Sequence, residues 1–272
     1  MREALKAAGD GCRTYGIVAA SSLRSRAAYT WNFTLSLFFQ MLMYSADVAA
    51  LLLMVRTAGA IGGWGTYDIL FLSGLVLASS GVYRVFGSEL HNFDKYLVHG
   101  EFDGVLIRPA HTLLTVAARS IDVEQGGAFL EGVVLMVLAW RHLAPDLGLG
   151  VVDALCAALA VACGAVIWFA VVTATAALGF WTTRIDDLQP VLLYGPETAV
   201  SYPLSIYPKA VRWIFQTILP VAFGSYVPAA AILRKGPPLS DLGWCAAVAA
   251  ASFVAALGLW NLGVRRYTST GS

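Results

Sequence analysis

Residues 151–181 read "VVDALCAALAVACGAVIWFAVVTATAALGFW", and this run decides the fold class of the chain. Asp153 is its only acidic residue before the helix would have to end. A helix of about 20 apolar residues is long enough to cross the hydrocarbon core of a bilayer. The many alanines and glycines of the run let neighbouring helices approach closely, as in packing between membrane helices. The run therefore predicts a spanning helix in an all-α integral membrane protein.

The composition of the whole chain agrees with a membrane protein. The 272 residues are 58% hydrophobic and 13% charged, with a mean hydropathy of +0.69, which is far more apolar than an ordinary soluble domain. The net charge of +1 provides no field for nucleic acid, so we expect no nucleic-acid partner. The four cysteines are scattered without the spacing of a disulfide framework or a metal site, so we expect neither.

Other apolar windows predict the remaining spans. Four of them are as long as a bilayer requires, and they cover residues 27–54, 67–87, 126–143 and 242–264. The stretch 185–233 is also apolar but contains six prolines, each of which removes a helical hydrogen bond. We expect a further span at about 186–206, followed by a re-entrant hairpin of short helices at about 208–233 on the extracellular side. The prediction is six transmembrane helices.

The distribution of lysine and arginine predicts the orientation of these spans. With both termini placed in the cytoplasm, the inside segments carry eleven of these residues and the outside segments six. We therefore expect a multi-pass protein of the cytoplasmic (inner) membrane. Residues 1–26 do not look like a signal peptide and are predicted to form an amphipathic helix on the cytoplasmic face, with a plain disordered tail as the alternative. Residues 27–272 would then form a single transmembrane domain.

The longest cytoplasmic connection, about 88–125, contains the charged stretch "DKYLVHGEFDGVLIRP" at residues 94–109. Its charges alternate with large apolar side chains, which predicts short amphipathic helices broken at Gly100 and Gly104 and stopped by Pro109. Apolar side chains flanked by both signs of charge are suited to docking against another protein. The alternative is that they pack onto the cytoplasmic ends of the chain's own helices.

The sequence has no pattern typical of an enzyme. It contains no G-x-x-x-x-G-K-[ST] for nucleotide phosphates, no G-x-S-x-G nucleophile elbow and no paired histidine spacing for a metal. We therefore predict that the chain is not an enzyme by itself and holds no cofactor.

Two stretches together resemble the ABC type-2 permease family, in particular its six-span branch of multidrug and viologen exporters. The first is "YLVHGEFDGVLIRP", and its matching residues are Tyr96, Leu97, Gly100, Glu101, Asp103, Arg108 and Pro109. The second is "YPLSIYPKAVRWIFQTILPVAFGSYVPAAAIL", and its matching residues are Tyr207, Pro208, Ile218, Leu219, Pro220, Ala222, Phe223, Tyr226, Pro228 and Ala229. The resemblance covers about residues 15–267.

The resemblance implies a transport subunit that dimerises or pairs with a related permease. Separate nucleotide-binding ATPase subunits would bind ATP and Mg, and the loop between spans two and three would carry the coupling helix. In this interpretation the charges of Glu101, Asp103 and Arg108 complement the ATPase, while Phe102 and Leu106 fill its surface groove. Tyr96 of the same motif is also predicted to contribute to docking.

A polar stripe in the first span is a candidate path for cargo. It consists of residues at steps of four, four, four and three, which fall within an arc of roughly 120° on one helix face: Asn32, Ser36, Gln40, Tyr44 and Asp47. Phe39 would offer an apolar contact nearby. The stripe predicts a substrate path between two permeases, and the alternative is polar bonding across a packed helix seam. Arg84, Glu131 and Arg141 are interpreted as structural charges.

These observations predict export of an amphiphilic small molecule, such as a drug, an antibiotic or a lipid-like compound. The alternative is a carrier or channel driven by an ion gradient without an ATPase. A carrier of that kind is expected to show unwound segments at matching positions of two repeats. Only the second half of this chain has a proline-broken hairpin, and only the first has a long charged loop, which disfavours a carrier.

Overall fold

The computed structural model describes residues 30–108, 110–182, 185–236 and 242–268, and this part of the chain is helical without a β-sheet. Five helices are long and apolar enough to cross a membrane, or up to six if one bent pair counts as a span. The prediction of an all-α membrane protein is confirmed. The five helices are α2 (Thr30–Ala58), α3 (Thr66–Gly87), α7 (Gly126–Leu147), α8 (Val151–Thr182) and α12 (Leu242–Arg266).

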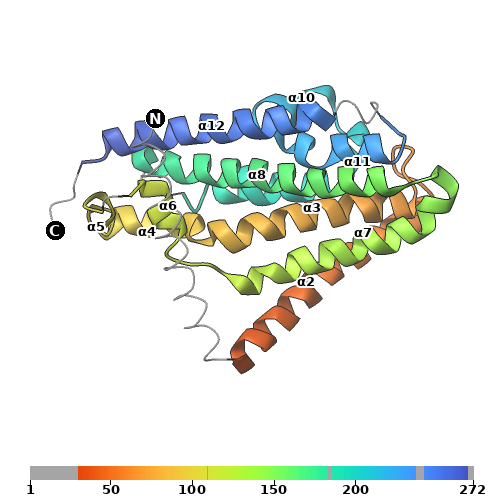
Figure 1. The fold of residues 1–272 in the computed structure, drawn as a ribbon, viewed down its shortest axis with the longest axis horizontal. Coiled ribbons are helices and arrows are strands. Elements are labelled where there is room, and N and C mark those ends of the chain that lie inside the picture. The colour runs from red at the N-terminus through yellow and green to blue at the C-terminus, as the bar shows by residue number, and fades with distance from the viewer. Residues whose placement is uncertain (1–29, 109, 183–184, 237–241, 269–272) are drawn as a thin grey trace.

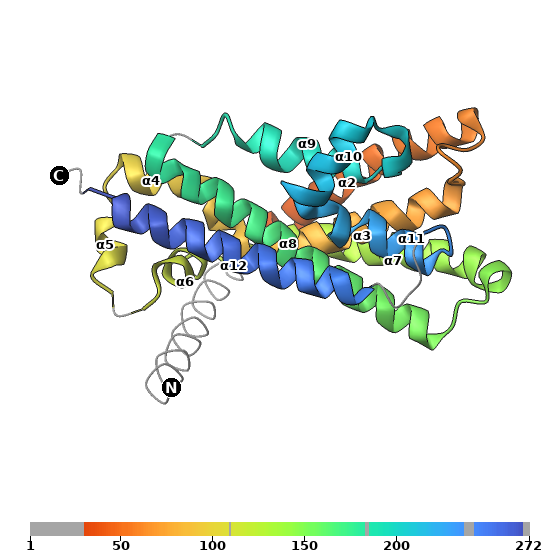
Figure 2. The ribbon, with the colours of Figure 1, turned by 90° about the horizontal axis from the view of Figure 1, so that it is seen from above.

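The long helices run nearly along one axis, with α3 and α8 in the middle of the bundle (Figures 1 and 2). Most side chains of α3 are buried because α7 and α8 pack on it, and α12 packs along α8. In contrast, α2 leans out from the bundle, and among its described side chains only Val48 and Val55 are buried (Figure 1). One broad apolar face of α2 is therefore uncovered in the single chain.

Short helices gather at one end of the bundle, which we call the loop end (Figure 1). The C-terminal end of α12 lies at the same end of the bundle (Figure 1). A chain with an even number of crossings has both of its ends on one side of the membrane, and this placement of α12 agrees with that. The break between α4 and α5 falls at Gly100, whose φ of 69° suits glycine. The second predicted break, at Gly104, is absent, because Gly104 lies inside α5. The elements of the loop end are η1 (Ser88–Asn92), α4 (Phe93–Val98), α5 (Asp103–Leu106), α6 (Thr112–Ala117) and η2 (Val123–Gln125). The predicted amphipathic helix at 1–26 lies outside the described residues.

The prediction of a regular span at 186–206 is wrong. The chain there forms a π-helix, η3 (Pro190–Tyr194), followed by α9 (Gly195–Val200) and a 3-10 turn, η4 (Leu204–Ile206). Even together, η3 and α9 would extend only about 17 Å at 1.5 Å per residue, which is too short for a hydrocarbon core of about 30 Å. The prolines explain this break, because each removes a backbone donor and restricts the residue before it.

The stretch expected to form a bent hairpin, about 208–233, contains α10 (Lys209–Thr217), η5 (Pro220–Gly224) and α11 (Tyr226–Ile232). The axis bends by 70° between α10 and the segment from Pro220 to Ile232. This pair is the sixth crossing if it is counted as one broken span.

The end of the bundle opposite the loop end is held by two aspartates. Asp68 and Asp153 each accept the backbone N–H of the glycine three residues before, at 2.8 and 2.9 Å, and so cap the starts of α3 and α8. The same carboxylates pair with Lys235 at 3.0 Å and Arg234 at 2.7 Å, just after α11. The broken segment is thereby tied to both central helices.

Close packing between α3 and α7 depends on glycine. A Cβ added at Gly132 would overlap the backbone nitrogen of Ala78, and one added at Gly74 would come within 2.8 Å of the Gly132 carbonyl oxygen. We expect Gly132→Ala to lower the free energy of unfolding by about 1–3 kcal/mol, because the two helices must move apart. Thermal unfolding of detergent-purified protein measures this.

Gly243 provides the matched control, because a Cβ there would meet nothing within 4 Å. Gly243→Ala is expected to be neutral or to stabilise the protein by up to about 1 kcal/mol through helix propensity. Equal effects of the two substitutions would contradict a seam between α3 and α7 that depends on glycine.

Candidate functional site

Phe102, predicted to be an exposed docking anchor, is fully buried at the loop end. Its ring lies 5.5 Å from that of Phe93, 5.3 Å from that of Phe180 in α8 and 5.0 Å from that of Tyr267 beyond α12, measured between ring centroids. This placement contradicts the predicted role, because the ring has no free surface to offer a partner. The prediction failed because an amphipathic pattern shows which side chains share a face, but not what that face contacts.

The surrounding contacts fasten the whole loop to the bundle. Trp260 of α12 is fully buried and packs on Phe93, and its indole N–H donates to the Thr112 hydroxyl of α6 at 2.9 Å. Tyr96 is also buried, and its hydroxyl donates to Glu89. We call Phe93, Phe102, Phe180, Trp260 and Tyr267 the aromatic cluster. The loop is therefore attached to the ends of α8 and α12.

Arg119 supports this attachment from the other side. Its guanidinium lies 4.9 Å from the centroid of the Tyr96 ring and pairs with Glu101 at 3.2 Å. Partial burial lowers the pKa of Arg119, but hydrogen bonds with Tyr96 and Glu101 raise it more, so the pKa lies above its ordinary value. Arg119 therefore stays charged.

Several other residues of the loop remain exposed. Of the predicted docking residues, Glu101, Leu106 and Arg108 are exposed and Asp103 is partly buried. Ile107 was not predicted as an anchor, yet it is the most exposed large apolar side chain of the loop at 85%. We call the group of Val98, Glu101, Leu106, Ile107 and Arg108 the docking surface, after the role that the sequence predicts for this loop.

The polar stripe of α2 is only partly gathered in one place. Ser36, Gln40 and Tyr44 are partly buried, whereas Phe39 and Asp47 are exposed; the side chain of Asn32 lies outside the described part. Tyr44 and Asp47 line a cavity of about 520 Å³ between α2, α3 and α9. We call it the polar cavity.

A buried ion pair lies in the wall of the polar cavity. Arg84 of α3 donates to Glu197 of α9 at 2.5 Å, and both side chains are at most 15% exposed. The Arg84 guanidinium also lies 5.6 and 5.8 Å from the ring centroids of Tyr83 and Tyr194. Arg84 was expected to have a structural role, and its partner across 113 residues was not predicted. The only feature of the sequence that could have pointed to Glu197 is that it is an acidic residue in an apolar, proline-broken stretch.

A second buried acidic side chain lies between α7 and α2. Glu131 of α7 is 5% exposed and accepts a hydrogen bond from Ser45 of α2 at 2.8 Å. Its other carboxylate oxygen has no hydrogen-bond partner among the described residues. The described intramembrane acids are therefore not all matched by cations.

Gln189 connects the polar cavity with the loop end. Its amide N–H donates to the His91 carbonyl oxygen at 2.5 Å, and its Oε1 lies 3.2 Å from Nδ1 of the same histidine. The His91 ring stacks on Tyr194, which lines the cavity, with centroids 6.2 Å apart. A contact path of three side chains thus joins η1 of the loop to the wall of the cavity.

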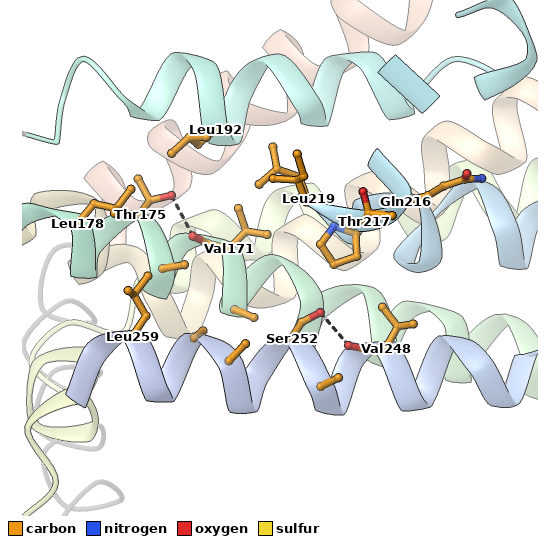
Figure 3. Close-up of a pocket in the computed structure, with 17 residues that line it drawn as sticks. Val171, Thr175, Leu178, Leu192, Gln216, Thr217, Leu219, Val248, Ser252 and Leu259 are labelled. Carbon is orange, nitrogen blue, oxygen red and sulfur yellow. Dashed lines mark hydrogen bonds between the residues drawn. The ribbon is translucent and has the colours of Figure 1, made fainter. Parts of the chain in front are cut away.

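A second cavity, of about 550 Å³, lies between α8, α12, η3 and the end of α10. Figure 3 shows Val171, Leu178, Leu192, Leu219 and Leu259 around it. The Thr175 and Ser252 hydroxyls donate to carbonyls of their own helices, at 2.9 and 2.7 Å (Figure 3). Because these hydroxyls are satisfied, the walls are apolar in character and suit hydrocarbon rather than a polar group.

A family model described as "ABC-2 family transporter protein" matches residues 41–271. The match covers most of the chain, including the loop end, the polar cavity and the bent pair. The chain belongs to the ABC-2 family of transporter proteins. This confirms the family predicted from the two motifs. Comparisons with curated proteins and with solved structures return no match.

Membership makes this ABC-2 transporter a membrane component of a transport system, in a family whose members are typically non-catalytic transmembrane subunits that work with ATPase partners. Its helices are those of a multi-pass membrane protein. Among the described residues there is no group of three or more His, Cys, Asp or Glu that could hold a metal ion. The predictions of a transport subunit and of a membrane location are confirmed at this level.

Proposed function

We propose that this ABC-2 transporter is the permease subunit of an exporter in the cytoplasmic membrane. Separate ATPase subunits that bind ATP and Mg drive it, and its cargo is an amphiphilic small molecule such as a drug, an antibiotic or a lipid-like compound. The observation that carries the proposal is the docking surface, which is exposed on one side and anchored to two spanning helices on the other.

The docking surface has the chemistry of a protein interface. Ile107 and Val98 are 85% and 58% exposed, and Glu101 and Arg108 place charges of both signs beside them. Apolar anchors surrounded by charged groups are typical of the centre and rim of such interfaces. An ATPase seated here would bury the exposed apolar area and pair with the rim.

The aromatic cluster supports a mechanical role for this surface. Phe102 of the loop contacts Phe180 of α8 and Trp260 of α12, so a force on the loop acts directly on both helices. Packed interiors are close to rigid and change between discrete arrangements. Movement of a docked ATPase would therefore tilt α8 and α12 and alter access to the cavities beside them.

The uncovered face of α2 supports a second permease, identical or related. Phe38 and Met43 on this helix are 60% and 70% exposed. The polar cavity opens beside the same helix through Tyr44 and Asp47. A second permease packed on α2 would enclose a path for cargo between the two subunits, as the polar stripe predicts.

Replacing Ile107 by aspartate tests the docking surface. We expect Ile107→Asp to weaken binding of the ATPase subunit about 30-fold or more, since loss of a central interface anchor costs about 2 kcal/mol or more. The permease is co-expressed with candidate ATPase subunits from the same genome, the complex is purified in detergent, and its stimulated ATP hydrolysis is measured. Both signals should fall without a change in the thermal unfolding of the permease.

Val151→Asp is the matched control, because Val151 is 78% exposed at the other end of the bundle. It makes the same chemical change away from the docking surface and should leave ATPase binding intact. If Ile107→Asp binds the ATPase as well as the wild type does, the proposed docking surface is wrong.

A further inference from the structure

A further cavity, of about 690 Å³, lies at the end of the bundle opposite the loop end, between the last turns of α2 and the first turns of α3. Figure 2 shows these two helices meeting at the end away from α4 and α5. The cavity lies on a different face of α2 from the polar cavity, and the two share no lining residue. We call it the rim cavity, and together with Ala49 it is lined by Leu52, Leu53, Arg56, Thr66, Tyr67 and Leu70.

The upper edge of the rim cavity carries a positive charge that no acid of the described chain neutralises. Arg56 lies in the last turn of α2, is exposed, and has no ion-pair partner among the described residues. Asp68 at the start of α3 is already paired with Lys235 at 3.0 Å. The end of a spanning helix lies at the level of the lipid headgroups. The cavity therefore presents an unmatched cation to the headgroup region of the membrane.

Hydroxyl groups lie at the same edge. Tyr67 and Thr66 both line the cavity at the start of α3. The Tyr67 ring stacks on His142 of α7, with centroids 4.0 Å apart and planes inclined by 11°. Nδ1 of His142 lies 3.1 Å from the Leu138 carbonyl oxygen of its own helix, so the partner ring is itself held in place. One guanidinium and two hydroxyls are the donors that a phosphate group requires.

Below this edge the wall of the cavity is apolar. Ala49 lies two turns before Arg56 on α2, which places it about 10 Å deeper in the membrane at 1.5 Å per residue. Leu52, Leu53 and Leu70 cover the space between, and Leu53 is 63% exposed. A small soluble anion would leave this apolar wall uncovered. A ligand that fits the whole cavity has an anionic head and a hydrocarbon chain directly beneath it.

We propose that the rim cavity binds an anionic phospholipid of the surrounding leaflet. Its phosphate pairs with Arg56 and accepts a hydrogen bond from the Tyr67 hydroxyl, and one acyl chain lies along Leu52, Leu53 and Leu70. The lipid stays in place as a component of the folded protein and is not cargo, so the inference goes beyond the proposed function. By filling the space between α2 and α3, it stabilises the helix that leans out from the bundle.

Three probes test the chemistry of this site on the detergent-purified permease by native mass spectrometry. Phosphatidylglycerol is anionic, phosphatidylcholine with the same acyl chains is zwitterionic, and glycerol 3-phosphate is an anion without a chain. Phosphatidylglycerol should bind at least fivefold more tightly than phosphatidylcholine, and glycerol 3-phosphate should not bind at matched concentrations. Equal binding of the two lipids would remove the charge preference and overturn the proposal. Equal binding of glycerol 3-phosphate and phosphatidylglycerol would show a plain anion site and overturn it as well.

Three variants place the lipid in the rim cavity. Arg56→Gln should weaken phosphatidylglycerol binding at least fivefold and leave phosphatidylcholine binding unchanged, because it removes the charge contact with the head. Arg56→Lys keeps the charge and should retain most of the affinity. Arg265→Gln is the matched control, because it removes an exposed arginine from the last turn of α12 at the loop end and should change little. The same affinity in Arg56→Gln and in the wild type would refute the assignment.

Two further readings check the position and the effect of the lipid. Phosphatidylglycerol with a photoreactive acyl chain should label peptides that contain residues 49–56 or 66–70, and labelling confined to other helices would contradict the site. Added phosphatidylglycerol should raise the unfolding temperature of the wild type more than that of Arg56→Gln. All of these measurements use the permease without an ATPase, so their outcome is independent of whether the ATPase binds the docking surface.

Discussion

Glu197→Gln is expected to lower the free energy of unfolding by about 3–5 kcal/mol, because it leaves the buried Arg84 charged without a counterion. Neither side chain of the pair is more than 15% exposed, so solvent compensates the unpaired guanidinium only in part. The same substitution loosens α9 from α3, since this ion pair is a direct polar link between them. The measurement is the thermal unfolding of detergent-purified protein, compared with the wild type.

Two controls separate the unpaired charge from other effects. The double variant Arg84→Met with Glu197→Leu removes both charges and should recover most of the stability, because apolar replacement of a buried pair is often neutral. Glu101→Gln breaks the pair with Arg119, in which the glutamate side chain is 56% exposed, and should cost less than about 1 kcal/mol. If Glu197→Gln is no more damaging than Glu101→Gln, the ion pair is not a structural link.

Phe102→Ala should cost about 3–5 kcal/mol of stability, as truncation of a fully buried aromatic side chain does. The lost ring contacts Phe93 in the loop, Phe180 in α8 and Tyr267 beyond α12, so the cavity opens where the loop joins the bundle. ATPase binding should also weaken, because the docking surface loses its fixed position. Thermal unfolding and co-purification with the ATPase are measured on the same preparation.

Ile107→Ala distinguishes the two roles that a large apolar residue of the loop can have. Its side chain is 85% exposed, so stability should remain within about 0.5 kcal/mol of the wild type while ATPase binding falls. If Phe102→Ala left stability unchanged and reduced only ATPase binding, the ring would be the docking anchor that the sequence predicts, and the buried placement would be wrong.

The long helices were predictable because hydrophobicity is a local property. The windows at 67–87 and 151–181 agree with α3 and α8 to within one residue at each end. The window at 186–206 was wrong because it counted apolar residues and gave too little weight to Pro190, Pro196 and Pro203, which break the backbone hydrogen-bonding of a helix. Apolar composition is needed for a spanning helix, but an uninterrupted backbone is needed as well.

The candidate sites were only partly predictable. The amphipathic pattern of the loop indicated docking or packing, and the structure shows that Phe102 packs inward while Ile107, five residues away, is exposed. The stripe on α2 pointed to Tyr44 and Asp47, which do line a cavity. Glu197 was missed because nothing near it in the sequence marks it as the partner of Arg84.

The amino-acid sequence by itself determined that this is an all-helical membrane protein of the ABC-2 family, because hydropathy, proline positions and short motifs are all local features. Only the tertiary structure decided which apolar residues of the loop are buried and which carboxylates meet a cation. Those outcomes depend on contacts between segments far apart in the chain, such as Arg84 with Glu197 and Thr112 with Trp260. Burial and pairing are decided by what covers a side chain, and that is determined by packing.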